Sequence, residues 1–114
     1  MADIYVTRGD ARDLDILIED PDHVAINVVD WEAEFALCAN ILGQEPLIHW
    51  TSAANPTKFD IGIADPEHVV IHLDDEDTAD LAPGWYAWDL KLTDLGGADF
   101  HPIAGYLHVA DAQV

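Results

Sequence analysis

Hydrophobic and polar residues alternate with a period of two along most of the chain, and the 3.6-residue period of an amphipathic helix is almost absent. The clearest alternation lies in the segment 12–19, where every second residue is apolar: Leu14, Ile16 and Ile18. Alternation of this kind is typical of strands that bury one face and expose the other. Short strands are therefore expected at residues 3–7, 12–19, 31–39, 47–51, 59–63, 69–73, 85–93 and 101–109.

The segment 31–39 is the one place where a helix competes with a strand. It is rich in Ala, Glu and Leu, which favour helices. Its apolar positions nevertheless follow period two better than period 3.6: Trp31, Ala33, Phe35, Leu37 and Ala39. A strand is the preferred interpretation.

The two strongest strand patterns, 85–93 and 101–109, are joined by a tight turn at 94–97. Their inward positions are expected to be Tyr86, Trp88, Leu90, Leu92, Ile103, Leu107 and Val109. Gly105, which lies among them, suits either a bulge or a close aromatic neighbour. Trp85 then faces outward, and Trp85 and Tyr106 are the candidate protein contacts, since exposed aromatic side chains are enriched at interfaces.

A short helical turn is expected near 75–81, because early acidic residues favour a helix N-terminus and Pro83-Gly84 ends the segment. Seven or eight short strands separated by turns indicate an all-β fold. No linker or repeat divides the 114 residues. The sequence thus predicts one domain, 1–114, built as a single antiparallel, immunoglobulin-like β-sandwich.

The chain carries 23 Asp and Glu residues against 4 Lys and Arg, a formal net charge of −19. One interpretation is adaptation to a salt-rich cytoplasm, where a Debye length of about 3 Å at molar salt screens the self-repulsion. Another is a specific use of charge, in imitating DNA or holding Ca²⁺. No basic patch can form, which excludes a nucleic-acid partner, and no apolar stretch is long enough for a membrane span.

Catalytic and metal-binding patterns are lacking, so the chain is expected to be neither an enzyme nor a cofactor-binding or metal-binding protein. His68 and His72 have helical zinc spacing, but four residues of strand span about 13 Å, too far for one ion. The acidic run 74–80 could supply oxygen ligands to a cation, and the sequence leaves this open. Cys38 lies in an apolar run, which favours a buried thiol. The integrin-type tripeptide Arg8-Gly9-Asp10 is interpreted as a turn between two strands.

The C-terminal third resembles a pattern of small tailed-phage and prophage structural proteins. Matching positions are Thr78, Leu81, Gly84, Tyr86, Trp88, Asp89 and Leu90, followed by Gly97 and the run Pro102 to Val109. The opening residues 3–10 are similar to the start of those chains. Such modules form the N-terminal β-sandwich of baseplate upper proteins and fibre-anchoring tail proteins, or stand-alone virion components.

The resemblance implies a non-enzymatic virion structural protein of a tailed virus, a capsid, neck, tail or fibre-anchoring component. The acidic composition suggests a halophilic host. Its expected partners are other virion proteins and further copies of itself, and its expected location is the virion, after synthesis in the host cytoplasm. The alternatives are an acidic DNA mimic or other inhibitory binding protein, and a Ca²⁺-dependent adhesion or carbohydrate-binding sandwich.

Overall fold

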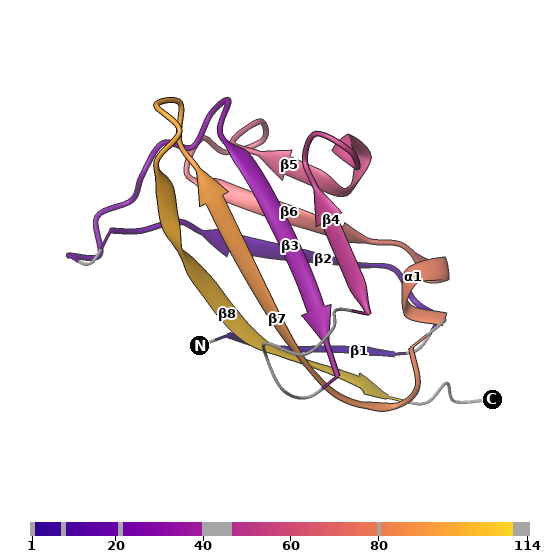
Figure 1. The fold of residues 1–114 in the computed structure, drawn as a ribbon. Coiled ribbons are helices and arrows are strands. Elements are labelled where there is room, and N and C mark those ends of the chain that lie inside the picture. Colours follow the sequence, from indigo (N-terminus) through magenta and orange to yellow (C-terminus); the bar gives the residue numbers. More distant parts are fainter. Residues whose placement is uncertain (1, 8, 21, 40–46, 80, 111–114) are drawn as a thin grey trace.

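A computed structural model describes residues 2–7, 9–20, 22–39, 47–79 and 81–110, and shows two β-sheets packed face to face (Figure 1). The larger sheet has the strand order β1-β8-β7-β3-β4, and the smaller has the order β2-β6-β5. The apolar faces of the two sheets form one core between them. The all-β sandwich predicted from the alternation is confirmed.

The strands are β1 (Ala2–Thr7), β2 (Arg12–Leu17), β3 (Glu32–Cys38), β4 (Ile48–Thr51), β5 (Phe59–Ile61), β6 (His68–Leu73), β7 (Gly84–Thr93) and β8 (Asp99–Ala110). A 3₁₀ turn, η1 (Pro56–Lys58), precedes β5, and one short helix, α1 (Asp75–Ala79), lies between β6 and β7. The eight strands, the strand at 31–39 and the helical turn near 75–81 agree with the sequence pattern. Within the described ranges, no helix combines the length and apolarity that crossing a membrane requires.

One strand pairing departs from the expected antiparallel sandwich. β1 runs parallel to β8, in register from Ala2 opposite Gly105 to Thr7 opposite Ala110, whereas the other strand pairs among the described residues are antiparallel. Antiparallel neighbours can be joined by a tight turn, but parallel neighbours need a long crossover. The chain leaves the large sheet after β1, because β2 belongs to the small sheet. The strand that pairs with β1 is β8, the last of the described strands.

Most inward positions predicted by period two are buried: Leu14, Ile16, Ile18, Ala33, Phe35, Leu37, Tyr86, Trp88, Leu90, Leu92, Leu107 and Val109. Of the face predicted for 31–39, Trp31 is only partly buried and Ala39 is exposed, because β3 begins after Trp31 and ends before Ala39. At the centre, the ring of Phe35 lies 6.2 Å from that of Trp88 and 5.9 Å from that of Trp50. Gly105 lies directly opposite Trp88, and the bulge falls instead between Leu90 and Leu92. The aromatic-neighbour interpretation of this glycine is confirmed. The side chain of Ile103 and the predicted turn at 43–46 lie outside the described residues.

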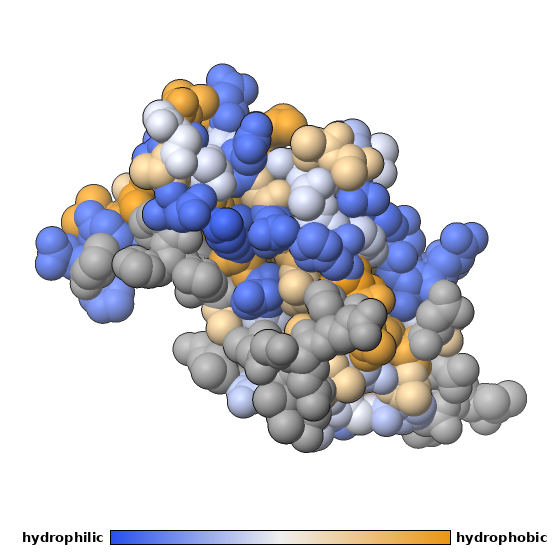
Figure 2. All heavy atoms as spheres, viewed as in Figure 1, coloured by the Kyte–Doolittle hydropathy of each residue, from blue (hydrophilic) through white to orange (hydrophobic). Residues whose placement is uncertain are grey.

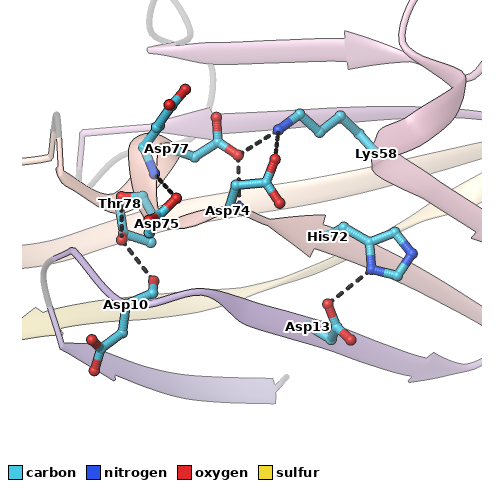
Figure 3. Close-up of polar contacts among 9 residues, drawn as sticks. Asp10, Asp13, Lys58, His72, Asp74, Asp75, Asp77 and Thr78 are labelled. Atoms are coloured by element: carbon cyan, nitrogen blue, oxygen red, sulfur yellow. Dashed lines mark hydrogen bonds and ion pairs between the residues drawn. The ribbon is translucent and has the colours of Figure 1, made fainter.

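The buried hydroxyl of Thr78 ties α1 to the turn between β1 and β2. It accepts a hydrogen bond from the Gly9 N–H (3.0 Å) and donates one to the Asp10 carbonyl (2.7 Å), which Figure 3 shows for Asp10. Gly9 has a φ of 87°, a left-handed conformation that favours glycine. Two residues of the integrin-type tripeptide therefore have a structural role; Arg8 lies outside the described residues.

Candidate functional site

Four aromatic rings from three neighbouring strands meet on the outer face of the large sheet. Tyr5 of β1 and Trp85 of β7 both lie opposite His108 of β8, so the three side chains form one row across the strands. The ring of Trp85 is 4.7 Å from that of His108, 5.8 Å from that of Tyr5 and 6.4 Å from that of Tyr106. We call Tyr5, Trp85, Tyr106 and His108 the aromatic patch.

The aromatic patch faces solvent because its neighbours along each strand fill the core. Val6, Tyr86 and Leu107 are buried, so the alternate residues point outward. Tyr5 is 61% exposed, Trp85 44% and Tyr106 37%. Both residues predicted as protein contacts, Trp85 and Tyr106, thus lie together on an open face.

Tyr5 and His108 were not predicted from the sequence to belong to this patch. Each is a single aromatic or imidazole residue in its own strand, with no local signal that distinguishes it. They join Trp85 only because β1 pairs in parallel with β8 at one particular register. The outward position of Tyr5 in its strand, followed by the inward Val6, was the one available hint.

The same outer face is polar beyond the aromatic patch. Figure 2 shows a band of hydrophilic residues across the middle of this face, where Glu34, His49, Asp89 and Lys91 project from β3, β4 and β7. The Glu34 carboxylate lies 2.6 Å from His49 Nε2, and Lys91 lies 3.4 Å from Asp99. Burial, and next the negative charge of Glu34, raise the pKa of Asp89. The face therefore combines aromatic rings with carboxylates.

The acidic run after β6 holds a lysine of this chain. Lys58 Nζ lies 2.8 Å from Asp74 and 2.7 Å from Asp77 (Figure 3). It also stands 4.8 Å from the centre of the Trp50 ring. Its side chain is only 19% exposed. Although burial lowers the pKa of Lys58, the hydrogen bonds to Asp74 and Asp77 outweigh it and raise the pKa overall. These two carboxylates are thus paired with an ammonium group.

Two histidines on the outer face of the small sheet each meet an aspartate from β2. His68 Nδ1 lies 2.7 Å from Asp15, and His72 Nδ1 lies 2.8 Å from Asp13. His68 also has Asp65 at 3.7 Å. Both histidine side chains are partly exposed, and their carboxylate partners could not be found from local sequence, because they come from a strand more than 50 residues earlier.

The hydrogen bond with Asp15 raises the pKa of His68, with smaller contributions from the charges of Asp65 and Glu67. A raised pKa in the folded state stabilises the protein fully below about pH 6.5, the unfolded value, and this contribution is lost as pH rises through the folded pKa. We expect Asp15→Asn to lower the pKa of His68. The free energy of unfolding of this variant should then decrease less as the pH rises from about 6.5 through the folded pKa of His68. NMR titration of the histidine ring and urea unfolding at several pH values measure the two effects.

The matched control is Asp13→Asn, which removes the same charge beside His72 and leaves the Asp15 hydrogen bond in place. It should change the His68 pKa much less. Equal shifts in the two variants would show that general surface charge, rather than the hydrogen bond, sets this pKa.

A cavity of about 630 Å³ lies between β4 and α1, lined mainly by apolar side chains such as Leu47, Trp50 and Leu81. This volume is in the range of ligand sites. Three polar side chains of its wall are engaged within the fold: His49 with Glu34, Asp77 with Lys58, and the Tyr86 hydroxyl with the Ala82 carbonyl. The cavity is therefore a weaker candidate than the aromatic patch.

Metal binding finds no support in the side-chain arrangement. Among the residues with described positions, no group of three or more His, Cys, Asp or Glu side chains is placed to hold a metal ion. The sequence left open whether the acidic run 74–80 binds a cation. Asp74 and Asp77 of this run contact Lys58, and Asp80 lies outside the described residues. Cys38 is buried, as expected.

The acidic residues are distributed over both sheets rather than gathered on one face. Asp13 and Asp15 project from the small sheet, and Glu32 and Glu34 from the large one. A DNA mimic requires carboxylates on one side at phosphate-like spacing. The distribution argues against that alternative.

Fold and site together define a β-sandwich domain with an exposed aromatic patch. No protein-family model and no curated protein matches the sequence. Among solved structures, the chain is similar to CopC from Methylosinus trichosporium OB3b, with a TM-score of 0.54 and 10% sequence identity over 100% of this chain and 89% of that chain. A likeness at this identity concerns the fold.

This comparison corrects the function expected from the sequence. The prediction of a tailed-virus virion structural protein is wrong, because the matching fold is that of a copper-binding protein and not of a capsid, neck or tail component. The described residues do not offer a copper site either, for want of three converging ligands. The site must be interpreted from its own geometry.

Proposed function

We propose that this domain is a non-catalytic binding module that recognises a protein partner through the aromatic patch. The observation that carries the proposal is the cluster of Tyr5, Trp85, Tyr106 and His108, in mutual contact on an open sheet face. Aromatic side chains supply a large contact area with few rotatable bonds, and they are enriched at the centres of interfaces. Rings that stay exposed to water contribute little to the stability of the folded domain, which favours a binding role for them.

The sheet supports this role by fixing the rings before any partner arrives. Three hydrogen-bonded strands hold the four side chains, and the rings restrain one another through edge-to-face contacts, such as the 72° angle between Tyr5 and Trp85. Binding to a preorganised surface costs less conformational entropy than binding to mobile loops. The polar band beside the aromatic patch corresponds to the rim of a typical interface.

The proposal is tested by selecting binders from a random peptide display library on the intact domain. Selected peptides are then measured against a double variant, Trp85→Ala with Tyr106→Ala. Because both side chains are partly exposed, the variant should keep its fold, which circular dichroism checks. We expect the selected peptides to lose at least tenfold in affinity.

The control is Leu17→Ala with Ile63→Ala, which removes two exposed apolar side chains, 45% and 82% exposed, away from the aromatic patch. It should leave affinity within about twofold, the usual effect of a remote surface change. Peptides that bind the aromatic double variant as tightly as the natural sequence would refute the proposed surface. Failure of the library to yield any specific binder would count against a peptide-recognition role.

A further inference from the structure

We propose that the partner segment is rich in lysine and arginine, and that its cationic groups bind against the rings of the aromatic patch. This inference rests on the proposed function and adds the chemistry of the partner. Ammonium and guanidinium groups are attracted to the faces of Trp and Tyr rings, and arginine also stacks on them.

The net charge of −19 favours a partner with positive charge. A field of this size attracts basic segments from a distance and speeds their encounter. It repels a second copy of the chain and anionic surfaces at ordinary salt. Within the described residues Lys58 and Lys91 are both paired with carboxylates of this chain, so neither is available to offset the remaining acidic groups.

The fold already binds one cation in the way proposed for the partner. Lys58 Nζ contacts Asp74 and Asp77 at 2.8 and 2.7 Å, two contacts that the close-up of this cluster shows (Figure 3). It also stands over the Trp50 ring, 4.8 Å from the ring centre. An aromatic face and flanking carboxylates together hold the ammonium group. The arrangement shows that this combination of groups is stable in this sandwich.

The outer face of the large sheet offers the same two kinds of group. Trp85 and Asp89 project from the same side of β7, four residues and about 13 Å apart. Asp89 forms no ion pair with any described residue, and it lies near Glu34, which raises its pKa after burial. A cation beside Asp89 would relieve this repulsion. The rings and this carboxylate thus favour one class of ligand, an extended segment with basic side chains.

The probe is a dye-labelled peptide of alternating glycine and arginine, titrated with the whole domain and followed by fluorescence anisotropy at 0.15 and 1 M NaCl. Trp85→Leu is the informative variant, because leucine keeps apolar area but removes the ring. We expect it to weaken binding about fivefold at both salt concentrations. Asp89→Asn should weaken binding by more than Asp22→Asn, a matched loss of one charge in the loop between β2 and β3.

No weakening by Trp85→Leu, together with equal weakening by Asp89→Asn and Asp22→Asn, would overturn the inference, since it would mean that only overall charge attracts the peptide. Display peptides that require Trp85 and Tyr106 but show no excess of Lys or Arg would also overturn it, while the proposed function stands. Sedimentation showing a dimer that Trp85→Leu abolishes would assign the aromatic patch to a second copy instead. Loss of patch dependence in both experiments would refute both proposals.

Discussion

Replacement of Thr78 by valine is expected to lower the free energy of unfolding by about 1–3 kcal/mol, because it removes two part-buried hydrogen bonds to the backbone of Gly9 and Asp10. The hydroxyl accepts from the Gly9 N–H and donates to the Asp10 carbonyl, and Thr78 is fully buried. Valine has nearly the same shape, so the packing is preserved while both hydrogen bonds are lost. Urea unfolding followed by tryptophan fluorescence measures the change.

Thr57→Val in η1 is the matched control, since Thr57 is exposed. A change of less than about 0.5 kcal/mol is expected there. If the two variants were equally stable, Thr78 would not fasten α1 to the turn at Gly9 and Asp10. A large effect confined to Thr78 would establish that the turn containing these residues is held by α1, far along the chain.

Replacement of Trp88 by alanine is expected to cost about 3–5 kcal/mol, the range for deleting a large aromatic side chain from a core. Trp88 is fully buried and packs on Phe35 at the centre of the sandwich. Its indole Nε1 is buried and has no hydrogen-bond partner among the residues that the structure describes, an unfavourable feature in itself. Trp88→Phe removes that donor and retains a ring, so it should cost less than half as much as Trp88→Ala.

The two Trp88 variants are compared by chemical denaturation at one pH and salt concentration. A phenylalanine variant as unstable as the alanine variant would contradict this order and would mean that the retained phenyl ring contributes nothing at this position. Phe35→Leu serves as a reference for a moderate loss of volume in the same layer. The order expected is natural sequence, Trp88→Phe, then Trp88→Ala.

The alternation of apolar and polar residues was sufficient to predict the fold class, most strand positions and the buried faces of β2, β3, β7 and β8. It succeeds because a strand places neighbouring side chains on opposite faces, which is a local property. Trp85 was correctly predicted to face outward on the same ground, since Tyr86 and Trp88 on its flanks fill the core.

Pairing between distant strands could not be predicted in the same way. The parallel partnership of β1 and β8 and the pairs of His68 with Asp15 and His72 with Asp13 all join residues far apart in the chain. A shift of one residue in register would move every side chain of a strand to the other face. Tyr5 and His108 belong to the aromatic patch only because of such a register. No local pattern in the sequence could therefore predict that they belong to it.

The function expected from the resemblance failed for a related reason. The positions that matched, Gly84, Tyr86 and Trp88, begin a strand and fill a core. Any sandwich with a long C-terminal hairpin uses residues of this kind for packing. Function depends on the outward residues between them, which that pattern does not specify.

The parallel pairing of β1 with β8 also has a kinetic consequence. Residue 4 lies opposite residue 107, so the first strand has its partner only when the last strand is in place. Contacts at such sequence separation slow folding, because a long loop must close before they form. During synthesis β1 is made long before β8 and has no strand to pair with until β8 follows. The edge of β8 that normally pairs with β1 can then bind β1 of another molecule instead. Exchange of this strand between copies is therefore the misfolding route that the topology favours.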